Sequence, residues 1–194
     1  VPLYVAQAIS SVMYLYAFSE AWSHLFPDHD GRLIALAGFV IVGTIAMVSA
    51  NLAAKAQAVM LGMVAVALLS ALAGLRTAEM HAPSLVGSFS EVSFMGSFAL
   101  FFPAATGIMV GAGMSGELAD PRRSLPRGTL AAWATTGALY LFFAVWYSVV
   151  ASPEELLTNK TVMVDKAGLG VLVLVGVLSS TLMAALSSLV AAPR

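Results

Sequence analysis

Charge is scarce in this sequence, and cysteine is absent. Only 10% of the 194 residues are charged and 60% are hydrophobic, whereas about 25% of the residues of a soluble domain carry charge. Such a chain has too little polar surface to cover a water-soluble globule. Without cysteine, disulfides and thiolate metal sites are excluded. The formal net charge of -1 offers no basic field for a nucleic acid.

Other signals of enzymes and metal sites are also missing. The three histidines, His24, His29 and His81, lie in or beside predicted loops and lack ligand-like spacing. We therefore expect no transition-metal site and no cofactor. No nucleophile–base pair or phosphate-binding loop is found, so an enzyme is not expected. The sequence begins at Val1 inside an apolar segment without a basic leader, unlike a signal peptide, and we expect it to be part of a longer protein.

Long apolar runs fill the rest of the sequence. A helix needs about 20 apolar residues to cross the hydrocarbon core, and six segments qualify. They are about 3–22, 33–50, 54–75, 94–115, 129–150 and 169–191. The sequence thus predicts an all-α integral membrane fold, with residues 1–194 forming one partial transmembrane domain in the lipid bilayer.

The charges of the connecting loops predict the orientation. If the loops alternate, one side holds Lys55, the arginines of loop 120–127 and Arg194, five basic residues against two acidic ones. The other side holds four basic residues against seven acidic ones. Short loops dense in arginine stay in the cytoplasm. Loop 120–127 is therefore predicted to be cytoplasmic, in a multi-pass protein of the plasma membrane.

The fourth segment is broken at residues 103–107. Pro103 removes a backbone donor and clashes with the preceding turn, and Gly107 frees the chain four residues later. A break exposes carbonyls near Phe102–Pro103, which attract a cation, and N–H groups at Gly107–Met109, which attract an anion. The hydroxyl of Thr106 can ligate a cation or cap the second half-helix. A simple proline kink is the alternative, because such kinks are common in membrane helices.

Two polar residues of the first segment extend this hypothesis. Tyr14 lies at mid-membrane, where its phenol oxygen can be a cation ligand or can bond to a neighbouring helix. Glu20 lies about 9 Å further out at helical rise. Its carboxylate is costly there unless paired or wetted, so it is either an outer-gate group or a residue at headgroup level.

The sequence FFPAATGIMVGAGMSGELADPRRSLPRGTLAAW closely resembles the sixth transmembrane helix and following loop of the cation–chloride cotransporters. These belong to the amino acid–polyamine–organocation superfamily. Three further stretches agree in order: AQAISSVMYLYAFSE with the third helix, AKAQ with the start of the fifth, and TLMAALSSLVAAPR with the end of the eighth. The resemblance implies helices three to eight of a bundle built from two inverted five-helix repeats.

The resemblance also implies roles for the polar residues and for the break. The potassium ligands would be Tyr14, Pro103 through its carbonyl, and Thr106. The chloride site would use the backbone N–H groups of Gly107, Ile108 and Met109. Glu20 would match an outer-gate carboxylate that pairs with an arginine of the first helix of the family.

One departure from the family pattern bears on the cation. Sodium-coupled members carry two adjacent serines in helix eight where this chain has Met183 and Ala184. A thioether and a methyl group are poor ligands for a hard cation, although Thr181 remains nearby. Sodium coupling is therefore doubtful, and a potassium–chloride type or a bacterial relative fits better.

We expect a secondary transporter that carries K⁺ and Cl⁻ together by alternating access. An amino-acid or polyamine permease is the alternative, because the N–H groups at Gly107–Met109 can receive a small amino acid's carboxylate in place of chloride. A channel or a non-transporting membrane scaffold is a third reading. The expected partners are lipid and small solutes. The sequence leaves open whether the protein forms a homodimer.

Overall fold

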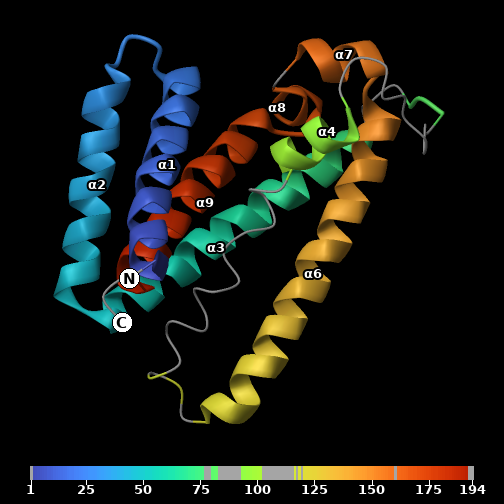
Figure 1. Ribbon diagram of the computed structural model, residues 1–194. Coiled ribbons are helices and arrows are strands. Elements are labelled where there is room, and N and C mark those ends of the chain that lie inside the picture. Colours follow the sequence, from blue (N-terminus) through green and yellow to red (C-terminus); the bar gives the residue numbers. More distant parts are fainter. Residues whose placement is uncertain are drawn as a thin grey trace. The chain divides into compact units, whose positions relative to one another are not determined.

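The computed structural model describes residues 2–76, 80–82, 93–101, 116, 118, 120–159 and 161–191, and these contain helices and turns but no strand (Figure 1). The described elements, in chain order, are α1 (Pro2–Leu25), α2 (Gly31–Val48), α3 (Ala50–Ala73), the 3-10 helix η1 (Gly74–Arg76), α4 (Phe94–Phe101), α6 (Pro121–Val150), α7 (Pro153–Thr158), α8 (Val162–Lys166) and α9 (Gly170–Ala191). Two compact units divide the chain: unit 1 holds 1–78 and 163–194, and unit 2 holds 79–162.

Helix starts in unit 1 follow from capping side chains. Asp30 precedes α2 and accepts a hydrogen bond from the backbone N–H of Arg32 at 2.8 Å. Ser49 alone connects α2 to α3, and its hydroxyl accepts from the N–H of Asn51 at 3.1 Å. Each cap satisfies a donor that the first turn of a helix leaves free, so these short polar connections fix where one helix ends and the next begins.

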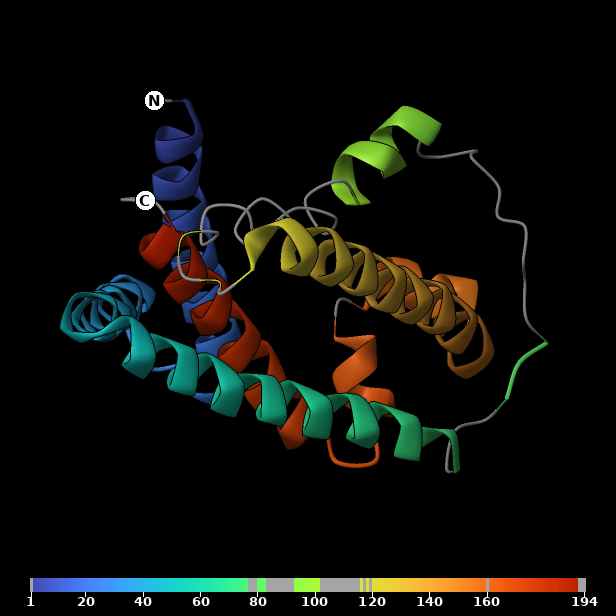
Figure 2. The same ribbon diagram turned by 90° about the horizontal axis from the view of Figure 1, so that it is seen from below.

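Helix α9 lies at the centre of unit 1. It packs against α3 and α1 most extensively, and also against α2. The start of α1 and the end of α9 lie at the same end of the unit, so these two helices run antiparallel (Figures 1 and 2). The end of α2 and the start of α3 lie at this end too (Figure 1). Unit 1 is therefore a helical bundle whose connections alternate between two ends.

Small residues let the helices of unit 1 approach one another closely. At Gly176 of α9, an added Cβ would overlap the Cβ of Ala67 on α3. At Gly38 of α2, it would lie 3.1 Å from the Leu15 side chain on α1. Close helix contacts through glycine and alanine are the usual means of association in lipid, where burial of apolar surface gives little driving force.

Four of the described helices are long and apolar enough to span a bilayer. They are Gly31–Val48, Asn51–Arg76, Pro121–Val150 and Gly170–Ala191, with mean hydropathy of 2.1, 2.4, 1.4 and 2.1. Helix α1 has 24 residues, but Gln7, Glu20 and several serines keep it outside this group. These helices confirm the all-α integral membrane class. The division into six membrane segments stays a prediction.

Unit 2 is built around α6. Asp120 caps this helix, Pro121 is its first residue, and the helix continues for 30 residues to Val150. The ring of Phe101 in α4 meets the ring of Tyr140 edge-on, with 5.3 Å between centroids. After α6, Ser152 caps α7 by accepting from the N–H of Glu155 at 3.2 Å.

Candidate functional site

The predicted break lies outside the described residues. This holds for Pro103, Thr106 and the three predicted anion-binding residues Gly107, Ile108 and Met109. The described part of that segment is α4, whose last residue, Phe101, comes two positions before Pro103. The cation and anion roles of the break therefore stay predictions, and the described geometry concerns the residues expected to complete the site.

Tyr14 lies at the middle of α1 and is half-buried. The neighbouring face of the helix is buried through Ser11, Leu15 and Phe18. In the part of the chain that the structure describes, the Tyr14 hydroxyl forms no hydrogen bond. A phenol at this depth needs a partner. The alternative reading, a tyrosine bonded to a neighbouring helix, thus finds no acceptor among the described residues.

Glu20 lies on a different face of α1. Six residues at 100° each place it about 120° around an ideal helix from Tyr14. Its side chain is exposed, and the described residues give its carboxylate no ion pair. The structure therefore does not bring Glu20 and Tyr14 together. An exposed carboxylate is compatible both with an outer-gate group and with a residue at headgroup level. The outer-gate role of Glu20 therefore stays a prediction.

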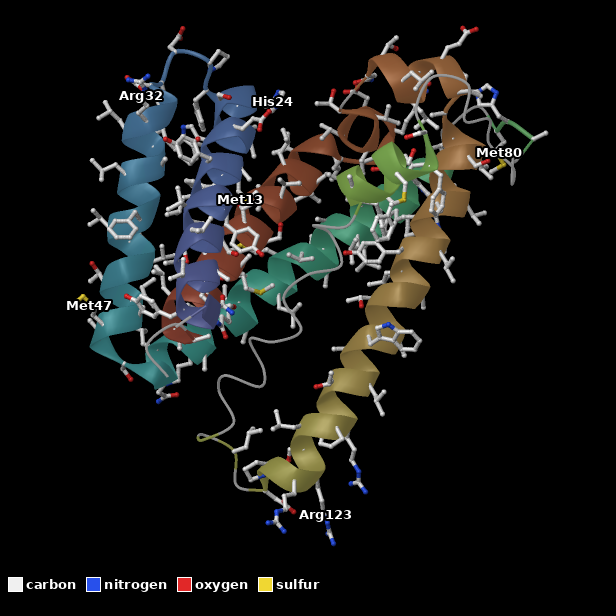
Figure 3. All side chains as sticks on the ribbon, in the orientation of Figure 1. Met13, His24, Arg32, Met47, Met80 and Arg123 are labelled. Carbon is white, nitrogen blue, oxygen red and sulfur yellow. The ribbon has the colours of Figure 1, made fainter. Side chains whose placement is uncertain are left out.

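An aromatic cluster lies close to Glu20 along the chain. The indole N–H of Trp22 donates to Nδ1 of His29 at 3.0 Å, and the rings of Phe26 and His29 stack at 5.3 Å. Figure 3 places His24 and Arg32 at this end of the α1–α2 pair, with Met47 at the other end. The cluster ties the turn between α1 and α2 to the last turn of α1.

The residues that decide whether a sodium ion can be coordinated lie on α9. Met183 and Ala184 are both half-buried there. The nearby Thr181 hydroxyl donates to the carbonyls of Val177 and Leu178, both at 3.0 Å. A hydroxyl that donates back along its own helix keeps its lone pairs for another partner. Thr181 can therefore accept a bond or ligate an ion, whereas Met183 and Ala184 offer no oxygen atom in their side chains.

The sequence interpretation missed the polar contacts between α3 and α9. The amide of Gln57 donates to the hydroxyl of Ser187 at 3.0 Å. The hydroxyl of Ser179 lies 3.1 Å from the sulfur of Met63. The sequence contained one usable signal, because an amide side chain inside an apolar segment must find a partner.

A similar contact fixes the start of α9. The Ser70 hydroxyl accepts from the N–H of Leu169 at 3.0 Å and donates to its carbonyl at 2.9 Å. The carbonyl of Ser70 accepts from the N–H of Gly168 at 2.9 Å. The end of α3 thereby satisfies backbone groups that would otherwise lack partners. Among the described residues, no group of three or more histidine or acidic side chains could hold a metal ion.

Comparison with known proteins identifies the family. The family model described as "Amino acid permease" matches residues 6–194. "Solute carrier family 12 member 8" of Mus musculus is 31% identical over 99% of this chain and 30% of its own length. "Solute carrier family 12 member 2" of Squalus acanthias is 29% identical over 97% of this chain and 21% of its own length.

A third relative covers part of the chain at higher identity. "Cation-chloride cotransporter 1" of Oryza sativa subsp. japonica is 48% identical over 49% of this chain and 10% of its own length. These relatives confirm the resemblance drawn from the broken segment. The chain spans between 10% and 30% of the length of the three relatives. Since the family model matches almost every residue, the chain belongs to the amino acid permease family.

Proposed function

We propose that this chain is the core of a secondary active transporter that moves potassium and chloride together by alternating access. The observation that carries the proposal is Tyr14, a mid-helix phenol for which the described residues supply no partner. The likeness to proteins named cation-chloride cotransporter supports chloride and a cation as the cargo. Membership of a permease family supports a transporter rather than an enzyme.

The potassium site joins Tyr14 to the predicted break. The phenol oxygen, the carbonyl of Pro103 and the hydroxyl of Thr106 supply hard oxygen ligands, which suit an alkali cation. The backbone N–H groups of Gly107, Ile108 and Met109 receive chloride at the positive end of the second half-helix. Both ions then lie at one discontinuity, where a membrane helix can expose backbone groups.

The residues of α9 argue against sodium as the coupled ion. Met183 and Ala184 contribute a thioether and a methyl group at the positions where sodium-coupled relatives are expected to carry serines. The nearby hydroxyls of Thr181, Ser180 and Ser187 already donate to carbonyls of their own helix. Because Met183 and Ala184 add no side-chain oxygen ligand for a hard cation, potassium without sodium is the favoured cargo.

Coupled uptake tests this proposal. The full-length protein, reconstituted in liposomes, takes up labelled rubidium in the presence of chloride but not of gluconate. Tyr14→Phe removes one ligand of the cation, and a bond to a charged group is worth about 1.5–3 kcal/mol. We therefore expect an apparent potassium affinity about tenfold weaker or worse. Thr106→Ala should also weaken the apparent potassium affinity.

Tyr16→Phe provides a matched control. Tyr16 lies on the same helix two positions further on and is 60% exposed, so its loss should leave the affinity for rubidium unchanged. Chloride-independent uptake, or equal effects of Tyr14→Phe and Tyr16→Phe, would contradict the proposed site.

A second candidate function is transport of an amino acid or polyamine. The family model is named for amino acid permeases, and the N–H groups predicted at Gly107–Met109 accept a carboxylate as well as chloride. Thermal-shift measurements distinguish the two cargoes. Stabilisation by chloride salts over gluconate salts supports the ion transporter, and stabilisation by an amino acid in gluconate supports the permease. In both cases the lipid bilayer is the protein's environment, with residues 120–127, at the start of α6, on the cytoplasmic side of the plasma membrane.

A further inference from the structure

We infer that the start of α6 is a binding site for the headgroup of an anionic phospholipid, formed by Arg122, Arg123 and Arg127. All three side chains are exposed, and Arg123 projects from the beginning of the helix (Figure 3). This site concerns the surrounding lipid and does not depend on which solute the protein carries.

The start of α6 holds an excess of positive charge. The carboxylate of Asp120 accepts from the N–H of Arg123 at 3.4 Å, and its other oxygen lies 3.8 Å from Nε of the same residue. Arg122 and Arg127 form no ion pair with an acidic side chain of the described residues. Glu117 lies outside the described residues, and its charge would still leave three arginines against two acids.

The helix itself adds to this excess. The first turn of a helix carries partial positive charge from its free N–H groups, which disfavours nearby cations. Arg122 and Arg123 lie in that first turn, directly after Pro121. The N-cap carboxylate of Asp120 offsets only part of this charge. An anion supplied from outside the chain would therefore stabilise the arrangement.

The depth of the arginines matches the layer of lipid phosphates. Residues 129–150 of α6 span about 32 Å at helical rise, close to the hydrocarbon thickness of about 30 Å. With Thr129 at its edge, Arg127 lies about 3 Å and Arg122 about 10 Å outside the hydrocarbon. That zone is the headgroup layer, where guanidinium groups bind phosphate oxygens in bidentate geometry.

The arginines share one side of α6 with exposed apolar residues. On an ideal helix Arg122, Arg123, Arg127, Leu130 and Trp133 fall within an arc of about 140°. Leu130 is 65% exposed and Trp133 is 64% exposed. Acyl chains can cover these two side chains while the headgroup meets the arginines. Charge and apolar surface together fit a lipid rather than free phosphate.

Quenching of Trp133 provides a local test. The full chain is placed in phosphatidylcholine bilayers that contain either brominated phosphatidylglycerol or brominated phosphatidylcholine. The part of the fluorescence that depends on Trp133 is obtained by subtracting the signal of the Trp133→Phe variant. We expect stronger quenching by the phosphatidylglycerol probe at low ionic strength, and a smaller difference at high ionic strength because salt screens these contacts.

Arginine variants assign this preference to the site. Each Arg→Gln change should lower the preference for phosphatidylglycerol by up to about fivefold, and the triple variant should abolish it. Arg122→Gln and Arg127→Gln are also measured singly, so the proposal stays testable if the triple variant does not fold. Arg32→Gln, an exposed arginine at the start of α2, is the matched control and should keep the full preference.

Three outcomes would overturn the inference. The first is equal quenching by the two probes, and the second is a preference that survives in the single and triple variants. The third is displacement of phosphatidylglycerol by inorganic phosphate beyond the effect of chloride at equal ionic strength. That last result would show that the arginines bind free phosphate instead of lipid.

Discussion

The contact between Gly176 of α9 and Ala67 of α3 gives a sharp prediction about unit 1. An added Cβ at Gly176 would lie closer than 3.0 Å to the Ala67 Cβ, a separation that real Cβ atoms essentially never show. The Ala67 Cβ is fixed by the backbone and the residue is only 6% exposed, so the methyl group cannot move aside unless the helix moves. The two helices must move apart by more than about 0.4 Å to regain ordinary van der Waals contact.

Overpacking of this kind costs about 1–3 kcal/mol. An alanine inside a helix also gains up to about 1 kcal/mol over glycine, and that gain must be subtracted. Gly62→Ala measures it, because Gly62 lies on α3 with no atom within 4 Å of an added Cβ. We therefore expect Gly176→Ala to be less stable than Gly62→Ala by about 1–3 kcal/mol.

Thermal unfolding of the chain in detergent micelles, followed by circular dichroism, measures this difference. One kcal/mol corresponds to a change in Tm of about 2–4 °C for a chain of this size. Ala67→Gly removes the overlapping methyl group, so adding it to Gly176→Ala should restore a large part of the loss. Equal Tm values for Gly176→Ala and Gly62→Ala, or no rescue by Ala67→Gly, would refute the close approach of α3 and α9.

Two hydrogen-bonded contacts yield further predictions. Ser70→Ala should lower the free energy of unfolding by about 1–3 kcal/mol, because the N–H of Leu169 loses its acceptor; an unchanged Tm would contradict this. Gln57→Leu and Ser187→Ala should show a coupling of about 0.6 kcal/mol in a double-mutant cycle of unfolding, the average for such bonds between membrane helices. Strictly additive effects would show that the pair does not interact.

The predicted apolar segments overlap the long described helices, but hydropathy did not predict where those helices begin. The apolar segment 129–150 corresponds to α6, which begins eight residues earlier at Pro121. That extension depends on Asp120 as a cap and proline as the first residue, a local signal that hydropathy ignores. The same signal, Ser152 followed by Pro153 and two glutamates, marks α7 between the predicted segments 129–150 and 169–191.

The candidate site was less predictable than the fold, for two physical reasons. The sequence located Tyr14 at mid-helix, but helical periodicity alone could not decide whether a neighbour accepts its proton. The break at Pro103 can be interpreted from backbone chemistry, but its ligands must converge from several helices, and distances between helices depend on packing rather than on spacing in the sequence. The contact between Gln57 and Ser187 joins residues 130 positions apart and was missed for the same reason.

Several polar side chains of unit 1 have hydrogen-bond partners, whereas Tyr14 has none among the described residues. The hydroxyls of Ser11 and Ser19 donate to carbonyls of their own helix. Gln57 donates to Ser187 on α9, and Ser70 donates to the carbonyl of Leu169, the residue before α9. Tyr14, which lies at the middle of α1 and is half-buried, has no hydrogen-bond partner among the described residues. Under the proposed function, the partner of this phenol is the cation bound at the predicted break, whose residues lie outside the described part of the chain.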